Sequence, residues 1–361
     1  MATKKMNTQK KILLLLLIGA VLLVFYKQNI FSGLKSETNT SIGETQPQKT
    51  LKDAKIIGWT AYWDEKNTLE ALPRSIERMS VFTPVLYRIE TDGSLEKYRV
   101  LYKKEFLQNA KNKNIAIMPQ IGDDFDFERV SLLLYDGKIQ EKFIESLIEE
   151  AKKEGFIGWD IDIESLKTKD RQAFSEFVEE TAEALHENNL KFSVTVFARV
   201  GNDDNPSALA QDYRALGKVS DEVRIMMYGA HDDETGPGGQ APLTWMRQVL
   251  NYAVKNIPGE KIVIGLSTHG YDWDNKKGEP LTFGQIQARI GEATPSVKFD
   301  EKVSSAIYRY QKDGQDREIW FENARAITEK MLIAMNEFGT DKFAIWRIGA
   351  EDPKIWEELG K

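Results

Sequence analysis

Residues 156–165 read FIGWDIDIES, so three acidic residues occupy every second position of this stretch. Side chains on a β-strand alternate between its faces, which would put Asp160, Asp162 and Glu164 on one face with neighbours about 7 Å apart. A helix would scatter the same side chains around its axis. An amphipathic edge strand with a solvent-exposed acidic face is the alternative, but adjacent like charges repel and acidic residues are depleted in strands. The pattern favours a strand whose carboxyl groups face a functional cavity.

The composition indicates a sizeable folded core. The 361 residues are 41% hydrophobic and 10% aromatic, which fits one large domain or two ordinary ones and argues against wholesale disorder. The net charge is −7, and residues 1–35 contain lysine but no acid, so the rest of the chain is more acidic still. An acidic body does not favour nucleic acid as a partner. The absence of cysteine excludes disulfides, thiolate metal sites and a cysteine nucleophile.

Residues 1–31 have the features of a signal anchor. A lysine-rich start precedes an unbroken apolar run over residues 12–26. The run is shorter than the about 20 residues of a spanning helix, but extension past Lys27 with a snorkelling lysine would make up the length. No small-x-small pattern follows, which favours an uncleaved, single-pass anchor over a cleaved peptide that would leave the body secreted. The lysine bias predicts a cytoplasmic N-terminus and a body outside the cytoplasm.

Residues 32–54 are polar and lack apolar periodicity, which predicts a flexible linker. Over residues 55–361, short apolar runs alternate with amphipathic segments, and this order predicts an α/β domain of parallel βαβ units. Eight such strands fit a (β/α)8 TIM barrel, a fold of about 250 residues plus insertions. A doubly wound open sheet is the alternative, although no Gly-x-Gly-x-x-Gly follows the first strand. The predicted strands are residues 55–63, 80–88, 115–120, 158–164, 191–197, 222–228, 261–267 and 342–348.

The interval between the last two predicted strands is too long for one crossover connection. It contains strand-like residues 305–311 and 318–321 around a turn, so we expect a small inserted α+β subdomain over about residues 274–320. The amphipathic segments that predict helices are residues 138–154, 171–188, 244–256 and 323–338.

Barrels of this kind carry their active site at the carboxyl ends of the strands. Glu164 ends the predicted fourth strand at that face, with Asp162 and Asp160 deeper in the barrel. Aromatic faces stack on sugar rings and carboxylates bind hydroxyls, although core packing explains each aromatic residue alone equally well. Several such groups on one rim predict a carbohydrate site. The candidates at other strand ends are Tyr62, Trp63, Gln120, Met227, Tyr228, Tyr271, Asp272, Trp273 and Trp346.

The pattern Phe-x-Gly-x-Asp-x-Asp-x-Glu over residues 156–164 resembles the signature of glycoside hydrolase family 18, the chitinases and endo-β-N-acetylglucosaminidases. The resemblance extends over about residues 55–357. Residues 226–228, Met-Met-Tyr, are similar to the Met-x-Tyr of the family's sixth strand, which alone is a weak signal. Residues 236–238 with 241–243, 261–266, 270–273, 319–325 and 346–352 are similar to the spore-germination and sporulation glycosidases of this family. The fourth-strand motif together with this ordered set is specific.

The resemblance implies a retaining, substrate-assisted mechanism without an enzymic carboxylate nucleophile. The 2-acetamido oxygen of the sugar would attack its own anomeric carbon, and water would open the resulting oxazolinium ion. Glu164 would protonate the leaving oxygen and then activate water. Asp162 would orient the acetamido group, and Asp160 would share a proton or hydrogen bond with Asp162. The implied sugar-binding residues are Tyr228 at the acetamido oxygen, Trp346 as the floor, and Gln120, Tyr62, Trp63 and Met226.

Two positions depart from the family pattern. Ile157 stands where the family usually has an acid, at the position of the motif furthest from the sugar. Gly229 follows Tyr228, where the family often has an acid, and this change removes a substrate contact. The acidic segments 123–126 and 231–233 lack a convincing set of metal ligands, so we expect solvated loops, no metal and no cofactor.

The sequence thus predicts a membrane-anchored, extracytoplasmic glycosidase that cleaves β-1,4 bonds in N-acetylglucosamine-containing polysaccharides. The anchor favours peptidoglycan, with chitin-like glycans as the alternative, and we expect a monomeric body. The main rival is a non-catalytic sugar-binding protein on the same barrel. Such relatives typically lose the terminal glutamate, whereas Glu164 is present. A third hypothesis, an envelope scaffold that no longer binds sugars, rests on Gly229.

Overall fold

The computed structural model describes residues 48–99, 103–274, 277–291 and 297–360. The predicted anchor, residues 1–31, and most of the predicted linker lie outside these ranges. Within them, no helix is both long enough and apolar enough to cross a membrane.

The folded body begins at Lys49, before the predicted end of the linker at residue 54. The backbone N–H of Lys49 donates to Asn336 Oδ1 at 2.9 Å, and its ammonium donates to the carbonyl of Gly339 at 3.1 Å. The N–H of Thr50 donates to the Asp53 carboxylate at 2.8 Å and closes the short turn η1 (Leu51–Asp53). The polar composition of this segment predicts a linker, but its polar groups have fixed partners in the body.

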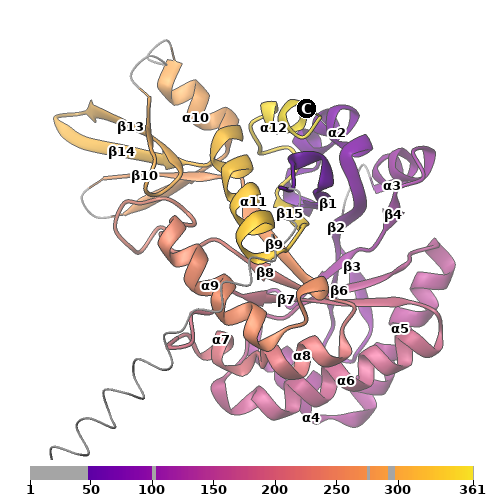
Figure 1. Cartoon of the computed structure of the whole chain (residues 1–361). Helices are drawn as coiled ribbons and strands as arrows, with labels where there is room; N and C mark the ends of the chain where they lie inside the picture. Colours follow the sequence, from indigo (N-terminus) through magenta and orange to yellow (C-terminus); the bar gives the residue numbers. More distant parts are fainter. Residues whose placement is uncertain (1–47, 100–102, 275–276, 292–296, 361) are drawn as a thin grey trace, which may run out of the picture. The chain divides into compact units, whose positions relative to one another are not determined.

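The predicted barrel is confirmed: eight parallel strands form a closed sheet (Figure 1). The first strand pairs with both the last and the second, which closes the ring. The third predicted strand consists of two short pieces, and β3 (Leu95–Lys97) adds an antiparallel strand to β2. The barrel strands are β1 (Lys55–Thr60), β2 (Met79–Ile89), β4 (Ala116–Ile117) with β5 (Gln120–Gly122), β6 (Gly158–Asp162), β7 (Lys191–Phe197), β8 (Glu222–Met226), β9 (Ile262–Ser267) and β15 (Lys342–Trp346).

Helices cover the outside of the barrel (Figure 1). The sequence explains the ends of α5: the carboxylate of Asp136 accepts from the first free N–H groups, and Gly155 ends the helix in the left-handed conformation with φ 75°. The four predicted helices are α5, α6, α9 and α11. The helices are α2 (Glu65–Ser75), α3 (Lys103–Asn112), α4 (Phe127–Tyr135), α5 (Gly137–Glu154), α6 (Arg171–Glu187), α7 (Pro206–Ala210), α8 (Tyr213–Val219), α9 (Leu243–Asn256), α10 (Phe283–Ile290), α11 (Ala324–Phe338) and α12 (Lys354–Glu358).

Strand β6 sorts the residues of the acidic motif onto two faces. Trp159, Ile161 and Ile163 are fully buried in the main hydrophobic cluster, and the indole N–H of Trp159 donates to the carbonyl of Leu147 on α5 at 2.9 Å. The acidic side chains take the other face, toward the inside of the barrel. The strand ends at Asp162, so Glu164 lies two positions beyond it rather than at its end.

An antiparallel sheet of five strands is inserted between β9 and β15, and Figure 1 shows it with α10 beside the barrel. Its central hairpin pairs residues 305–312 with residues 315–321, where the sequence predicts two strands around a turn. The sheet already begins at Gly270, upstream of the predicted boundary, because β10 pairs with β14. Its strands are β10 (Gly270–Trp273), β11 (Gly278–Leu281), β12 (Lys298–Asp300), β13 (Ser305–Lys312) and β14 (Gln315–Phe321).

Gly158 at the start of β6 provides a test of the barrel packing. Its φ is +155°, and a Cβ added there would lie 1.9 Å from the carbonyl oxygen of Lys191 on β7. We expect Gly158→Ala to lower the free energy of unfolding by about 3 kcal/mol, because the paired backbone must move. Urea unfolding followed by circular dichroism measures the loss. Gly137→Ala on α5 is the control, since nothing lies within 4 Å of its added Cβ. Equal unfolding midpoints for the two variants would contradict the expectation.

Candidate active site

A cavity of about 230 Å³ lies at the carboxyl ends of the barrel strands. Asp160 does not line it and lies fully buried beneath. A larger cavity, of about 1080 Å³, lies at the opposite mouth of the barrel and contains none of the predicted site residues. The predicted site residues that line the smaller cavity are Tyr62, Trp63, Gln120, Asp162, Glu164, Met226, Tyr228 and Trp346.

Three other rim candidates lie elsewhere. Tyr271, Asp272 and Trp273 are absent from the lining of the cavity because they form β10 of the inserted sheet. The carboxylate of Asp272 accepts there from Arg317 Nε at 2.9 Å. Met227 is fully buried in the main core. The end of a predicted strand is therefore an imprecise guide to the rim, because neighbouring residues face opposite sides of the sheet.

Asp160 is held by side chains from several strands of the barrel. Its carboxylate pairs with Arg224 Nη1 on β8 at 3.2 Å, and both side chains are inaccessible to solvent. The proton or hydrogen bond that the family resemblance implies between Asp160 and Asp162 stays a prediction. The neutral donors to Asp160 are Ser193 Oγ at 2.7 Å, Thr195 Oγ1 at 3.0 Å, Gln120 Nε2 at 3.1 Å and Trp59 Nε1 at 3.3 Å.

Asp162 is less completely bonded than Asp160. Its Oδ1 is buried and has no hydrogen-bond partner among the described residues. Burial raises the pKa of Asp162 well above its usual value, and the negative charges of Glu164, Asp160 and Asp123 raise it further. A buried carboxyl oxygen without a partner, at the wall of a cavity, is suited to receive a hydrogen bond from a ligand.

Glu164 has the protonation behaviour that a general acid and base requires. Burial raises the pKa of Glu164 to about 7, with a further contribution from the charge of Asp123. The Glu164 carboxyl is therefore partly protonated near neutral pH and can both give and accept a proton.

Asp123 is a site residue that the sequence analysis placed in a solvated loop, and this prediction is wrong. Its side chain is only 3% exposed. Its Oδ2 accepts from the backbone N–H of Glu164 at 3.1 Å and of Ser165 at 2.7 Å. These bonds position the chain just after β6 and divert its N–H groups from strand pairing. The signal in the sequence was an aspartate three residues after the predicted strand 115–120, and it directly follows the observed strand β5.

The rim next to Asp123 includes further residues that the sequence analysis missed. Asp124 accepts from Arg88 Nη1 at 2.7 Å and also from the hydroxyl of Tyr98. The Tyr98 ring stacks on Tyr62 with centroids 3.8 Å apart, and both rings line the cavity. Among the described residues, no group of three or more histidine or acidic side chains is arranged to hold a metal ion.

Tyr228 can donate a hydrogen bond at any ordinary pH. Burial raises the pKa of its hydroxyl well above the usual value, and the negative charge of Asp162 raises it further. The ring of His269 lies 6.2 Å from that of Tyr228, and burial together with Arg347 lowers the pKa of His269 to about 4. This histidine is therefore neutral at pH 7. Gly229 has φ +83°, and a Cβ added to it would meet nothing within 4 Å, so there is open space at residue 229 itself.

Trp346 forms an aromatic floor together with two other indoles. Its ring lies 6.2 Å from Trp59 and 6.2 Å from Trp63, both in edge-to-face geometry. Trp63 is 60% exposed although it lines the cavity, which makes its face available to a ligand. The cavity therefore combines a titratable carboxyl group near neutral pH, a second carboxyl with a free oxygen, a phenol donor and aromatic walls. This combination is suited to protonating and cleaving a glycosidic bond.

Comparisons with known proteins agree with this chemistry. The model of the glycosyl hydrolases family 18 matches residues 58–351. The uncharacterized glycosylase YvbX of Bacillus subtilis (strain 168) is 26% identical over 322 residues, 86% of this chain and 93% of that protein. The cortical fragment-lytic enzyme of the same strain is 28% identical over 245 residues, 64% of this chain and 56% of that enzyme. The chitinase from Chromobacterium violaceum ATCC 12472 superposes with a TM-score of 0.78 at 25% identity, covering 85% of this chain and 98% of that one. The chain therefore belongs to glycosyl hydrolase family 18 and is a glycosidase.

Proposed function

We propose that this glycosidase hydrolyses β-1,4 bonds of N-acetylglucosamine-containing glycans by substrate-assisted, retaining catalysis. The observation that carries the proposal is the pair of unequal carboxyls at the cavity: Glu164 with a pKa of about 7, and Asp162 with an unpartnered oxygen. A non-catalytic sugar-binding protein has no need of a carboxyl that titrates near neutral pH.

The proposed reaction has two steps. Glu164 first gives its proton to the glycosidic oxygen while the acetamido oxygen of the sugar attacks the anomeric carbon, and the bond to the leaving sugar breaks. The Glu164 carboxylate then takes a proton from water, whose oxygen attacks the anomeric carbon and opens the oxazolinium ring. Both proton transfers use one carboxyl group, which is why a pKa near neutrality supports this role.

The remaining groups act on the acetamido group. The free oxygen of Asp162 accepts a hydrogen bond from its N–H, and the charge of the Asp162–Glu164 pair stabilises the positive charge that develops on the ring. The Tyr228 hydroxyl donates to the acetamido oxygen and holds it for attack. Trp346 stacks under the sugar at the cleaved bond.

We propose peptidoglycan as the natural glycan, with chitin-like oligomers as the second candidate. The name of the cortical fragment-lytic relative supports a cell-envelope polymer, and the chitinase neighbour supports the second candidate. The lysine-rich start and apolar run of residues 1–31 support a body held outside the cytoplasm by an uncleaved anchor.

Replacement of the proposed proton donor tests the activity. We expect Glu164→Gln to lower kcat by about 10³-fold, because the amide cannot transfer a proton, while glycan binding persists. Release of reducing ends from N-acetylglucosamine oligomers and from purified peptidoglycan measures the loss. Glu145→Gln, at an exposed position on α5, is the control and keeps wild-type rates. Binding of both glycans by wild type and Glu164→Gln alike, with products from neither, would identify a sugar-binding protein instead.

The charge of Asp123 should set the alkaline limit of the activity. Glu164 must be protonated to act as the acid, so kcat/KM should fall as the pH rises through the pKa of about 7. Asp123→Asn removes a negative charge that raises this pKa, and we expect the alkaline limb to move down by roughly half to one pH unit. The pH dependence of kcat/KM measures the shift. An unchanged limb, or one moved upward, would exclude this role for Asp123.

Mass spectrometry of the protein isolated from membranes tests the anchor. We expect an N-terminus upstream of residue 12, so that the apolar run over residues 12–26 is retained. A mature protein that starts near Lys27 would mean that the segment is a cleaved signal peptide.

A further inference from the structure

A fully buried arginine lies beneath the carboxyl groups of the active site. The guanidinium of Arg224 on β8 spans the interior of the barrel. Its Nη1 pairs with Asp160 at 3.2 Å and donates to Thr83 Oγ1 at 3.0 Å. Its Nη2 lies 3.3 Å from the sulfur of Met118. The proposed mechanism makes no direct use of this charge, so its place in the core requires another explanation.

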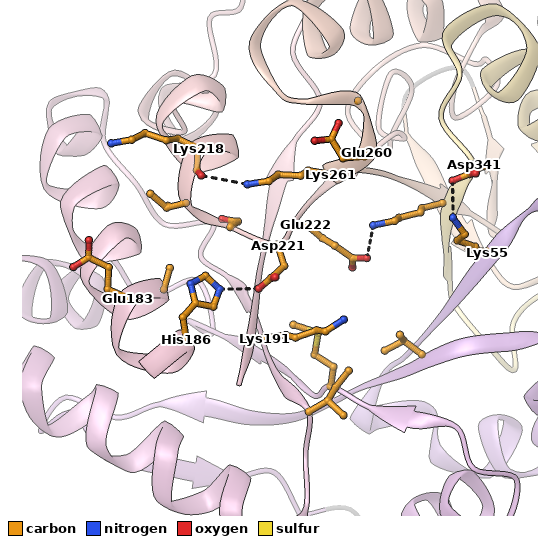
Figure 2. A pocket seen from close by; sticks show the side chains of 18 of the residues that line it. Lys55, Glu183, His186, Lys191, Lys218, Asp221, Glu222, Glu260, Lys261 and Asp341 are labelled. Carbon is orange, nitrogen blue, oxygen red and sulfur yellow. Dashed lines mark hydrogen bonds and ion pairs between the residues drawn. The ribbon is translucent and has the colours of Figure 1, made fainter. Parts of the chain in front are cut away.

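The other edge of the same guanidinium faces the opposite mouth of the barrel. Arg224 Nη2 lies 3.1 Å from Glu222 Oε2, and Glu222 Oε1 pairs with Lys342 Nζ at 3.1 Å. Burial alone would raise the pKa of Glu222, but the charges of Arg224 and Lys342 bring it below the usual value. Glu222 and Lys342 line the cavity of about 1080 Å³ at this mouth. Figure 2 shows Glu222 among the charged residues of this cavity. A row of alternating charges therefore crosses the barrel from Asp160 to the amino-terminal mouth.

The positive charge of Arg224 determines how much of the negative charge of Asp160 remains unbalanced. A buried carboxylate without a counter-charge is strongly destabilising, and Arg224 supplies the positive charge that balances Asp160. The carboxylate of Asp160 also accepts from neutral donors, and its negative charge raises the pKa of Asp162. Asp160 therefore acts on Asp162 through its charge, and the size of that effect depends on how completely Arg224 balances it.

We propose that Arg224 is a positioning residue of the glycosidase: it fixes Asp160 in the barrel core and sets the net charge beneath Asp162, and thereby the pH range in which the Asp162–Glu164 pair works. The inference rests on the proposed function, because it assigns to Arg224 an effect on the proton transfers of that reaction.

The charged and titratable groups around this network come from several elements. Asp160 faces Arg224 across the barrel and Asp162 on its own strand. Asp162 in turn faces Glu164, Asp123 after β5 and Tyr228 after β8. Glu222 faces Arg224 and Lys342. The uncharged groups that contact Asp160 or Arg224 are Trp59 on β1, Thr83 on β2, Met118 between β4 and β5, Gln120 on β5, and Ser193 and Thr195 on β7.

This arrangement fixes the sign of the expected shifts. Removal of the positive charge of Arg224 takes away the cation that balances the carboxyls of Asp160, Asp162 and Glu164. These carboxyls together then bind protons at higher pH. Removal of the negative charge of Asp160 has the opposite effect, because an unbalanced cation then lies under Asp162. Removal of both charges restores the balance. The proposed reaction needs negative charge on the Asp162–Glu164 pair, so the acid limb of kcat/KM should follow these shifts.

The experiment is a charge cycle in the full chain. We expect Arg224→Met to move the acid limb of kcat/KM on N-acetylglucosamine oligomers up by about one pH unit, and Asp160→Asn to move it down. The double variant should return to within a few tenths of a unit of wild type, and Arg224→Lys should keep the wild-type limb. If Arg224→Met does not fold, Arg224→Gln serves as the second neutral variant. The double variant is less at risk of misfolding, because it has no unpaired carboxylate at residue 160.

A second readout separates this inference from the proposed function. Carbon-13 NMR of the Asp and Glu carboxyls follows protonation without turnover, and we expect the same shifts in the signals that Asp162→Asn and Glu164→Gln remove. Lys330→Met is the matched control: it breaks a buried ion pair with Glu322, 2.5 Å long, and should lower stability without shifting either titration. If the wild type is inactive but the carboxyl titrations shift in the Arg224→Met and Asp160→Asn variants as expected, only the proposed function is overturned. Unshifted titrations in Arg224→Met, or a double variant displaced as far as Arg224→Met, overturn the role of Arg224.

Discussion

The ion pair between Asp160 and Arg224 is the constraint on which the rest of the site depends. Both side chains are fully buried, so each would be costly without the other. The neutral donors to Asp160 come from β1, β5 and β7, and Arg224 comes from β8. These contacts can form together only when the sheet has closed with the right stagger between strands. Closure of the barrel and assembly of the active site are therefore one event.

A gradient of hydrogen bonding along β6 explains why three similar residues have different chemistry. Both carboxylate oxygens of Asp160, at the bottom, accept hydrogen bonds, and Arg224 balances its charge. Asp162 retains one oxygen without a partner, and Glu164 lies beyond the strand end with a pKa of about 7. Each step of two residues along the strand moves a carboxyl about 7 Å toward the mouth of the barrel. The regular spacing of the motif thus yields three carboxyls in three different environments, which is the basis of the different roles proposed for them.

The sequence predicted the barrel and half of the residues that line the cavity, because both follow largely from local periodicity. Alternation places Asp160, Asp162 and Glu164 on one face whatever the neighbouring strands do. Arg224 and Asp123 were missed because their roles depend on contacts between strands far apart in sequence, 64 residues for Arg224 and Asp160 by their numbering. Such contacts are set by the stagger of the closed barrel, which a residue pattern does not encode. Tyr98 was missed because it follows a short antiparallel strand, β3, rather than a barrel strand.

The open position at Gly229 is consistent with an active enzyme when the charges around Glu164 are considered together. Burial and Asp123 already raise the pKa of Glu164 to about 7. An acidic residue at position 229 would carry its charge at an exposed position, and the φ of +83° there favours glycine. The pKa of Glu164 is raised without such an acid, and a general acid and base works best when its pKa lies close to the working pH. Glycine at residue 229 is therefore compatible with both proton transfers proposed for Glu164.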